Sequence, residues 1–371
     1  MVARDTFARP LPDGSHRLSA MTHLGDALDR LAAETGFSGV MRVDRGGRIE
    51  LARACGLAHR GLGVANTLDT QFAVASGTKA LTALTVVSLV EEGRVELATT
   101  ARSVLGEDLP LIHDDVTILE LLAHRSGIGD YIDEDAGVDV LDHLLPVPVH
   151  ELASTESYLR VLDGYPAKFR PGVRFAYCNS GYVVLALIAE RVTGTGFHDL
   201  VGERVCAPAG MADTAFLRSD ELPGRAAVGY LAAAGLRTNV LHLPVRGSGD
   251  GGIYTTVADV HALWAALFAG RIVSADWVAE MVRPRSDVPE DSIRYGLGFW
   301  LHATAASVMI EGEDAGVSFR SAHEPATGTT YTVISNTTDG AWPIVRHLDD
   351  EVMATAVRRA TSQGGHRGCR L

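Results

Sequence analysis

A serine and a lysine stand three positions apart in the segment FAVASGTKALTAL, residues 72–84. The chain holds 33 lysines and arginines together, of which only Lys79 and Lys168 are lysines. If a helix begins at Ser76, this spacing places both side chains on one face, within reach of each other. A lysine whose pKa is lowered by burial can take the proton of a serine hydroxyl, whereas arginine is effectively never deprotonated. The pair therefore indicates an activated serine nucleophile.

The same pair has a simpler interpretation, in which Ser76 caps a helix and Lys79 is a solvated residue of the first turn. Two features oppose it. A cation near the start of a helix opposes the helix dipole, and the apolar residues before Ser76 are typical of a buried strand. The motif alone leaves both interpretations open.

A second candidate is the tripeptide Tyr177-Cys178-Asn179, which directly precedes an apolar helical pattern. In isolation, Asn179 or Ser180 would simply cap that helix and Tyr177 would be a core residue. Together with the serine–lysine pair, the tripeptide indicates a catalytic group.

Three longer segments extend these motifs: ELLAHRSGIGDY, PGVRFAYCNSGYVVLALIAERVTG and GDGGIYTTVADVHAL. In type and order they resemble the serine β-lactamase-like superfamily, which includes class C β-lactamases, DD-peptidases and related esterases. The resemblance implies that Ser76 is the acylated nucleophile, Lys79 its base or proton relay, and Tyr177 a proton shuttle to the leaving group. Asn179 would hydrogen-bond the substrate or Lys79. Whether Lys79 or Tyr177 is the primary base stays open.

The chain departs from that family at its third motif, a KTG or HxG on a strand facing the nucleophile. Aligning MIEGEDAGVSFRS on its glycine places Ile310, Glu311 and Gly312 at the three positions. The amides of Ser76 and Glu313 would then form the oxyanion hole, with Ile310 and Gly312 beside the substrate. A register shifted by one restores no cation either. In the family, that lysine or histidine helps to hold the substrate carboxylate or to polarise the tyrosine, so its absence weakens a penicillin or D-Ala-D-Ala specificity.

Strand patterns occur at both ends of the chain and helical patterns lie between them. Residues 37–56 predict a hairpin that turns at Gly46 and Gly47, and residues after about 290 predict further strands. The helical patterns cover 18–35, 78–92, 117–124, 156–163, 180–193, 197–205, 256–269 and 342–360. This order predicts an α/β (α+β) fold, with a sheet built from both ends of the chain and an inserted helical domain. The resemblance implies that the sheet is antiparallel, flanked by N- and C-terminal helices and joined to an all-helical insertion, as in β-lactamases and transpeptidases.

The predicted domain boundaries follow from that order. Residues 15–80 together with 285–360 would form the sheet domain, and 81–284 the helical domain with the active-site loops. Residues 361–371 are expected to be a flexible tail.

Composition excludes several other classes of protein. A net charge of −13 argues against nucleic acid or an anionic membrane as a partner. The four cysteines lie far apart and fit neither a disulfide framework nor a zinc site, and no metal or other cofactor is implied. The segment GSGDGG, residues 247–252, lacks the ending of a Walker loop and indicates turn glycines near the cleft. His124 is expected to be a structural histidine.

These observations predict a serine hydrolase that acts through an acyl-enzyme on a small ester or amide, with its oligomeric state open. The amino-terminal residues lack an apolar export signal, so a cytoplasmic location is expected. Two alternatives remain: an acyltransferase with the same nucleophile, and a catalytically silent homologue that only binds a ligand.

Overall fold

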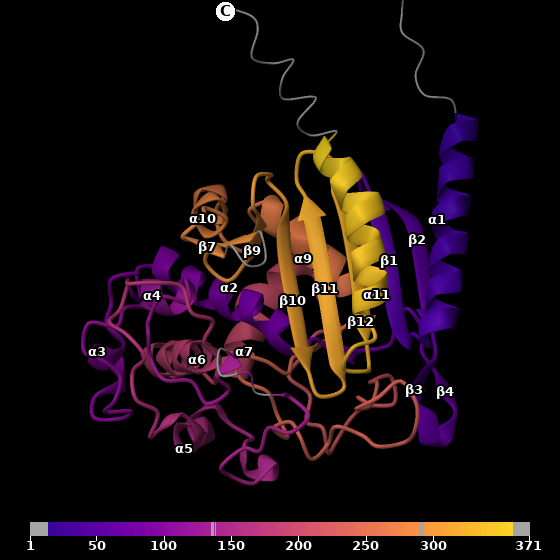
Figure 1. Ribbon diagram of the computed structural model, residues 1–371. Helices are drawn as coiled ribbons and strands as arrows, with labels where there is room; N and C mark the ends of the chain where they lie inside the picture. Colours follow the sequence, from indigo (N-terminus) through magenta and orange to yellow (C-terminus); the bar gives the residue numbers. More distant parts are fainter. Residues whose placement is uncertain (1–13, 135–136, 138, 289–292, 359–371) are drawn as a thin grey trace, which may run out of the picture.

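An antiparallel sheet built from both ends of the chain organises the fold (Figure 1). The computed structural model describes residues 14–134, 137, 139–288 and 293–358. The eight strands run in the order β2-β1-β12-β11-β10-β9-β8-β7. Their bounds are β1 Gly39–Arg45, β2 Arg48–Cys55, β7 Ser286–Val288, β8 Ile293–Tyr295, β9 Trp300–His302, β10 Val308–Asp314, β11 Val317–Glu324 and β12 Thr329–Ser335. Since β1 pairs with β12, the two ends of the chain meet in one sheet, as the sequence predicts.

Alternating apolar residues bury both faces of the sheet. Val40 and Ile334 belong to a large core shared with the middle of the chain, whereas their neighbours Met41 and Val333 belong to a second core. This is the period of two expected for strands, whose successive side chains point to opposite faces. Helices α1 (Gly14–Thr35) and α11 (Trp342–Leu348) cover the second core, and α9 (Val257–Phe268) packs on the other face (Figure 1).

The middle of the chain is mainly helical, as predicted. Two helices run through its core, α2 (Thr78–Glu91) and α6 (Asn179–Thr193), and they pack against each other. Shorter helices surround them: α3 Ala101–Leu105, α4 Ile118–Leu122, α5 Leu159–Leu162, α7 Phe197–Val201, α8 Ala207–Ala209 and α10 Ala275–Met281. The middle is not purely helical, because β6 (Tyr254–Thr255) pairs with β5 (Phe72–Ala73) just before α2. A separate short ladder joins β3 (Leu57–His59) and β4 (Val64–Ala65).

One expected strand is divided in two. Residues 294–302 form β8 and β9, joined by a turn in which the Gly296 amide donates to the carbonyl oxygen of Phe299. Gly298 has a φ of +84°, and a Cβ there would lie 2.3 Å from that of Ala83 on α2. The turn therefore lets the sheet edge approach α2 closely.

The predictions for the end of the chain have different outcomes. The closing helix is confirmed as far as residue 358, although a π-helical turn, Asp349–Met353, interrupts it. The predicted tail, 361–371, lies outside the described residues, and the division into two domains stays a prediction.

No helix in the described part of the chain is long and apolar enough to cross a membrane. Among those residues, no three His, Cys, Asp or Glu side chains are grouped to hold a metal ion.

Strand β10 presses against the turn that carries Ser76. This turn, η2 (Ala75–Gly77), leads directly into α2, and Ala75 has a φ of +43°. Such a left-handed conformation is uncommon for a residue other than glycine and costs roughly 1–3 kcal/mol. A Cβ on Gly312 would lie 2.4 Å from the carbonyl oxygen of Val74 and 2.5 Å from the amide nitrogen of Ser76. The contact therefore requires glycine at position 312.

We expect Gly312→Ala to lower the free energy of unfolding by about 1–3 kcal/mol, because the added methyl group forces β10 away from η2. Urea denaturation followed by circular dichroism measures this loss. The control is Gly202→Ala, where a Cβ would meet no atom within 4 Å. Equal unfolding midpoints for the two variants would show that the contact tolerates a side chain.

Candidate active site

Lys79 lies at the centre of a buried hydrogen-bond network. Its Nζ donates to Ser76 Oγ at 2.9 Å, to Asn179 Oδ1 at 2.7 Å and to the backbone carbonyl oxygen of Asp250 at 2.7 Å. Only 3% of the residue is exposed. Burial lowers the pKa of Lys79 from its ordinary value, while nearby carboxylates, first that of Asp250 and then that of Glu134, oppose the shift. The helical spacing of Ser76 and Lys79 thus brings the two side chains into direct contact.

The three acceptors also fix the direction of the amine lone pair. An ammonium has three N–H donors, which these acceptors match. When Lys79 is neutral it keeps two, and Asn179 Oδ1 and the Asp250 carbonyl are acceptors only. The third direction faces the Ser76 hydroxyl, which is able to donate. The geometry can therefore present a lone pair to the serine proton.

Tyr177 lies in contact with two aromatic rings beside this pair. Its ring centroid lies 4.4 Å from that of His124 and 5.9 Å from that of Trp300, and the Trp300 ring is nearly parallel to it. Lys79 Nζ lies 4.9 Å from the ring centroid of Tyr177. Burial raises the pKa of Tyr177 well above its ordinary value, although a hydrogen bond with the Ser76 side chain lowers it in part. The side chain is therefore a neutral phenol next to the serine.

Asn179 is positioned by a carboxylate that sequence reasoning missed. Asp130 accepts hydrogen bonds from the amides of Asn179 at 2.7 Å and Ser180 at 2.8 Å, and from Ser180 Oγ at 3.0 Å. Asp130 thus satisfies the start of α6, and the Asn179 side chain is left to bind Lys79 instead of capping the helix. Asp130 stands in the segment ELLAHRSGIGDY, but nothing local distinguishes it from any other loop aspartate.

The glycine loop at 247–252 forms the third side of the network. The carbonyl oxygen of Gly249 accepts from Thr82 Oγ on α2 at 2.6 Å, and a Cβ on Gly249 would lie 2.1 Å from the carbonyl oxygen of Tyr182 on α6. The loop is therefore in close contact with both helices, next to the cleft where it was expected. The loop provides Lys79 with one acceptor, the backbone carbonyl oxygen of Asp250. The sequence could not indicate this acceptor, because every residue has a backbone carbonyl group.

His124 is buried, and its Nδ1 accepts a hydrogen bond from the amide of Cys178 at 3.1 Å. Burial lowers the pKa of His124 well below its ordinary value. The expected structural role thus includes a contact that the sequence did not indicate, the one with the ring of Tyr177.

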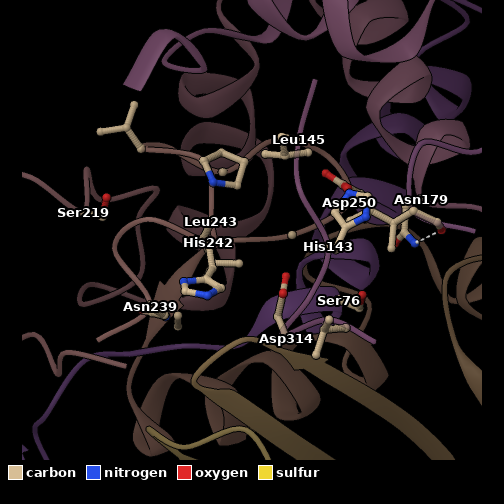
Figure 2. A pocket seen from close by; sticks show the side chains of 18 of the residues that line it. Ser76, His143, Leu145, Asn179, Ser219, Asn239, His242, Leu243, Asp250 and Asp314 are labelled. Carbon is tan, nitrogen blue, oxygen red and sulfur yellow. Dashed lines mark hydrogen bonds between the residues drawn. The ribbon is translucent and has the colours of Figure 1, made fainter. Parts of the chain in front are cut away.

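A pocket opens beside Ser76 (Figure 2). Ser76, Asn179 and Glu313 line it, and so do the carboxylates of Asp250 and Asp314. Apolar side chains form much of the remaining wall: Val140, Leu145, Leu217, Leu243 and Val245. The nucleophile candidate is therefore accessible to a ligand from a cleft that is partly acidic and partly apolar.

The third motif is only partly at this pocket. Gly312 contacts the Ser76 turn, and Glu313 follows it in the pocket wall. Ile310 lies on the same face of β10 as Gly312, is 3% exposed, and packs in the large core outside the pocket wall. Glu311 lies on the opposite face and pairs with Arg320. Neither residue places a cation near Ser76.

Residues 24–352 match the family described as Beta-lactamase, and the chain belongs to this family. It is 37% identical over 194 residues to Esterase EstB of Burkholderia gladioli, covering 51% of this chain and 48% of that protein. It is 30% identical over 277 residues to a D-aminopeptidase of Brucella anthropi, covering 72% of this chain and 50% of that protein. The chain thus spans about half the length of these curated relatives.

A solved structure of the penicillin binding protein from Bacillus halodurans matches the fold with a TM-score of 0.81 and 32% identity. The match covers 87% of this chain and 99% of that one. The predicted fold class, an antiparallel sheet with flanking helices and a helical insertion, is confirmed.

We expect Asp130→Ala to lower the free energy of unfolding by several kcal/mol, because each buried amide left without an acceptor costs about 1–3 kcal/mol. Asp130→Asn keeps one acceptor oxygen and should lose less. Urea denaturation of the two variants measures the difference. If both unfold at the same urea concentration, the carboxylate does not hold the start of α6.

Proposed function

We propose that the protein is a serine hydrolase that forms an acyl-enzyme with a small ester or amide. The observation that best supports this proposal is the set of hydrogen bonds made by Lys79. Its buried amine donates to Ser76, to Asn179 and to the glycine loop. The names of the relatives, an esterase and a D-aminopeptidase, support ester or amide substrates.

In the proposed acylation, Ser76 Oγ attacks the substrate carbonyl carbon while its proton passes to the neutral amine of Lys79. The carbonyl oxygen takes up the negative charge, and the amides of Ser76 and Glu313 donate hydrogen bonds to it. When the bond to the leaving group breaks, the proton passes from Lys79 through the Tyr177 hydroxyl to the leaving oxygen or nitrogen. The acyl group remains as an ester of Ser76.

In the proposed deacylation, water attacks the acyl carbon and gives a proton to the same group of bases. The bond to Ser76 Oγ then breaks and the serine regains a proton, which restores the starting state. Lys79 suits the role of base better than Tyr177 does. Burial lowers the pKa of the lysine and raises that of the tyrosine, so the lysine is the side chain closer to deprotonation at neutral pH.

We expect a fluorophosphonate probe to add once to the wild-type protein, because the activated Ser76 displaces fluoride from phosphorus. Intact-mass spectrometry detects the adduct. Ser76→Ala should give none, whereas Ser274→Ala, a change at an exposed serine, should label like the wild type. A wild-type protein that takes up no probe would instead support the catalytically silent alternative.

We expect Lys79→Arg to reduce kcat/KM for a p-nitrophenyl ester by about 10²–10⁴, because arginine keeps the charge but does not accept the serine proton. In the wild type, the rate should rise with pH as Lys79 loses its proton, with a midpoint below 10.5 since burial lowers that pKa. The control is Lys168→Arg, which changes the other lysine, paired with Asp133. A pH-independent rate, or full activity in Lys79→Arg, would exclude lysine as the base.

A further inference from the structure

The pocket wall near Ser76 is rich in carboxylates. Glu134, Asp250, Glu313 and Asp314 all line it, and no lysine or arginine does among the described residues (Figure 2). The ammonium of Lys79 is the nearby counter-charge, but its three hydrogen bonds already hold it beneath the pocket. Acidic side chains therefore outnumber basic ones where a substrate would lie.

Asp314 differs from two of the other acids in how it is paired. Asp250 accepts a hydrogen bond from the Tyr131 hydroxyl, and Glu313 accepts one from Trp342 Nε1. One oxygen of Asp314 accepts from the amide of Ala315 at 2.8 Å, and the other has no hydrogen-bond partner among the described residues. Figure 2 shows this carboxylate directed into the pocket that Ser76 also lines. A carboxylate oxygen in this position is available to a ligand.

The negative charge of Asp314 is destabilised by its surroundings unless a ligand pairs with it. Burial, with a further contribution from the Asp250 carboxylate, raises the pKa of Asp314 to about 7. A substrate carboxylate near this group would meet like charge, and Ile310 offers no cation to offset it. A positively charged substrate group would be attracted instead.

We infer that the natural substrate is an ester or amide with an ammonium group a few bonds from the scissile carbonyl, and that Asp314 binds this group. The inference rests on the proposed hydrolase function and names the substrate class of the same site. The apolar wall, which includes Leu145 and Leu243, suits the methyl or methylene groups that surround such a nitrogen. The Asp314 carboxylate would attract a cationic substrate and repel one that bears a carboxylate.

The test compares esters of different charge, each cationic ester being matched to a neutral isostere, at pH 8, which is above the pKa of Asp314. Butyrylcholine and its uncharged isostere 3,3-dimethylbutyl butyrate place the charge in the alcohol part. Methyl 4-(trimethylammonio)butyrate, methyl 5,5-dimethylhexanoate and monomethyl glutarate place a positive, no or a negative charge in the acyl part. We expect kcat/KM for a cationic ester to exceed that of its neutral isostere about tenfold or more, and the glutarate to be slowest.

The matched variants are Asp314→Asn and Glu34→Gln, each of which removes one negative charge. Glu34 is exposed on α1, so its variant should keep the preference for the cationic ester, and Asp314→Asn should lose it. Labelling of Ser76 by the fluorophosphonate probe checks that each variant has a folded site. A preference that persists in Asp314→Asn would overturn the role of Asp314.

The measurements distinguish a wrong substrate class from a wrong hydrolase function. Hydrolysis of neutral and cationic isosteres at equal rates would overturn the inferred substrate class and leave the hydrolase function intact. Absence of turnover with every ester, together with no adduct on Ser76, would overturn the hydrolase function itself.

Discussion

The site depends on the burial of a single amine. An ammonium out of water is stable only when its donors are paired, and Lys79 has three acceptors for three N–H groups. They come from the turn before α2, from the start of α6 and from the glycine loop. A displacement of any one of these segments leaves a buried donor without its partner. The stability of the site and the orientation of its amine therefore have the same origin.

Close backbone contacts make this arrangement possible. Gly249 allows the glycine loop to lie against α6, and Gly312 allows β10 to lie against the amide of Ser76. Neither contact leaves room for a Cβ, so the absence of a side chain brings these backbones within reach of Lys79 and Ser76. The sheet holds β10 in turn, because its alternate residues are anchored in cores on both faces.

Local patterns in the sequence were sufficient for much of the fold. The hairpin turn at Gly46 and Gly47, the later strands and the long helices follow from periodicity and turn residues, which act over a few positions. The contact of Ser76 with Lys79 follows from helical spacing for the same reason. The division of 294–302 into two strands was missed. The turn between them brings Gly298 against Ala83 on α2, a long-range contact that local patterns do not indicate.

The missed parts of the site are those that depend on the tertiary fold. Asp130 reaches the start of α6 from about fifty positions away, and the Asp250 carbonyl is a group that every residue possesses. The position of Ile310 could be aligned from the sequence, but its burial in the core, away from the pocket wall, required the structure. The types of the residues thus indicate which reaction the site could perform. They do not indicate which distant backbone segments the fold brings to the site.

The acidic pocket and the buried lysine are electrostatically linked. The carboxylates of Asp250, Glu134 and Asp314 raise the pKa of Lys79 and so work against its release of a proton, while burial works in favour of it. A cation bound at Asp314 would offset part of that negative field and lower the pKa of Lys79 further. Under the proposed mechanism, a cationic substrate would thus promote the neutral form of the base that attacks it. A carboxylate-bearing substrate would have the opposite effect, so substrate charge would influence both binding and the activation of Ser76.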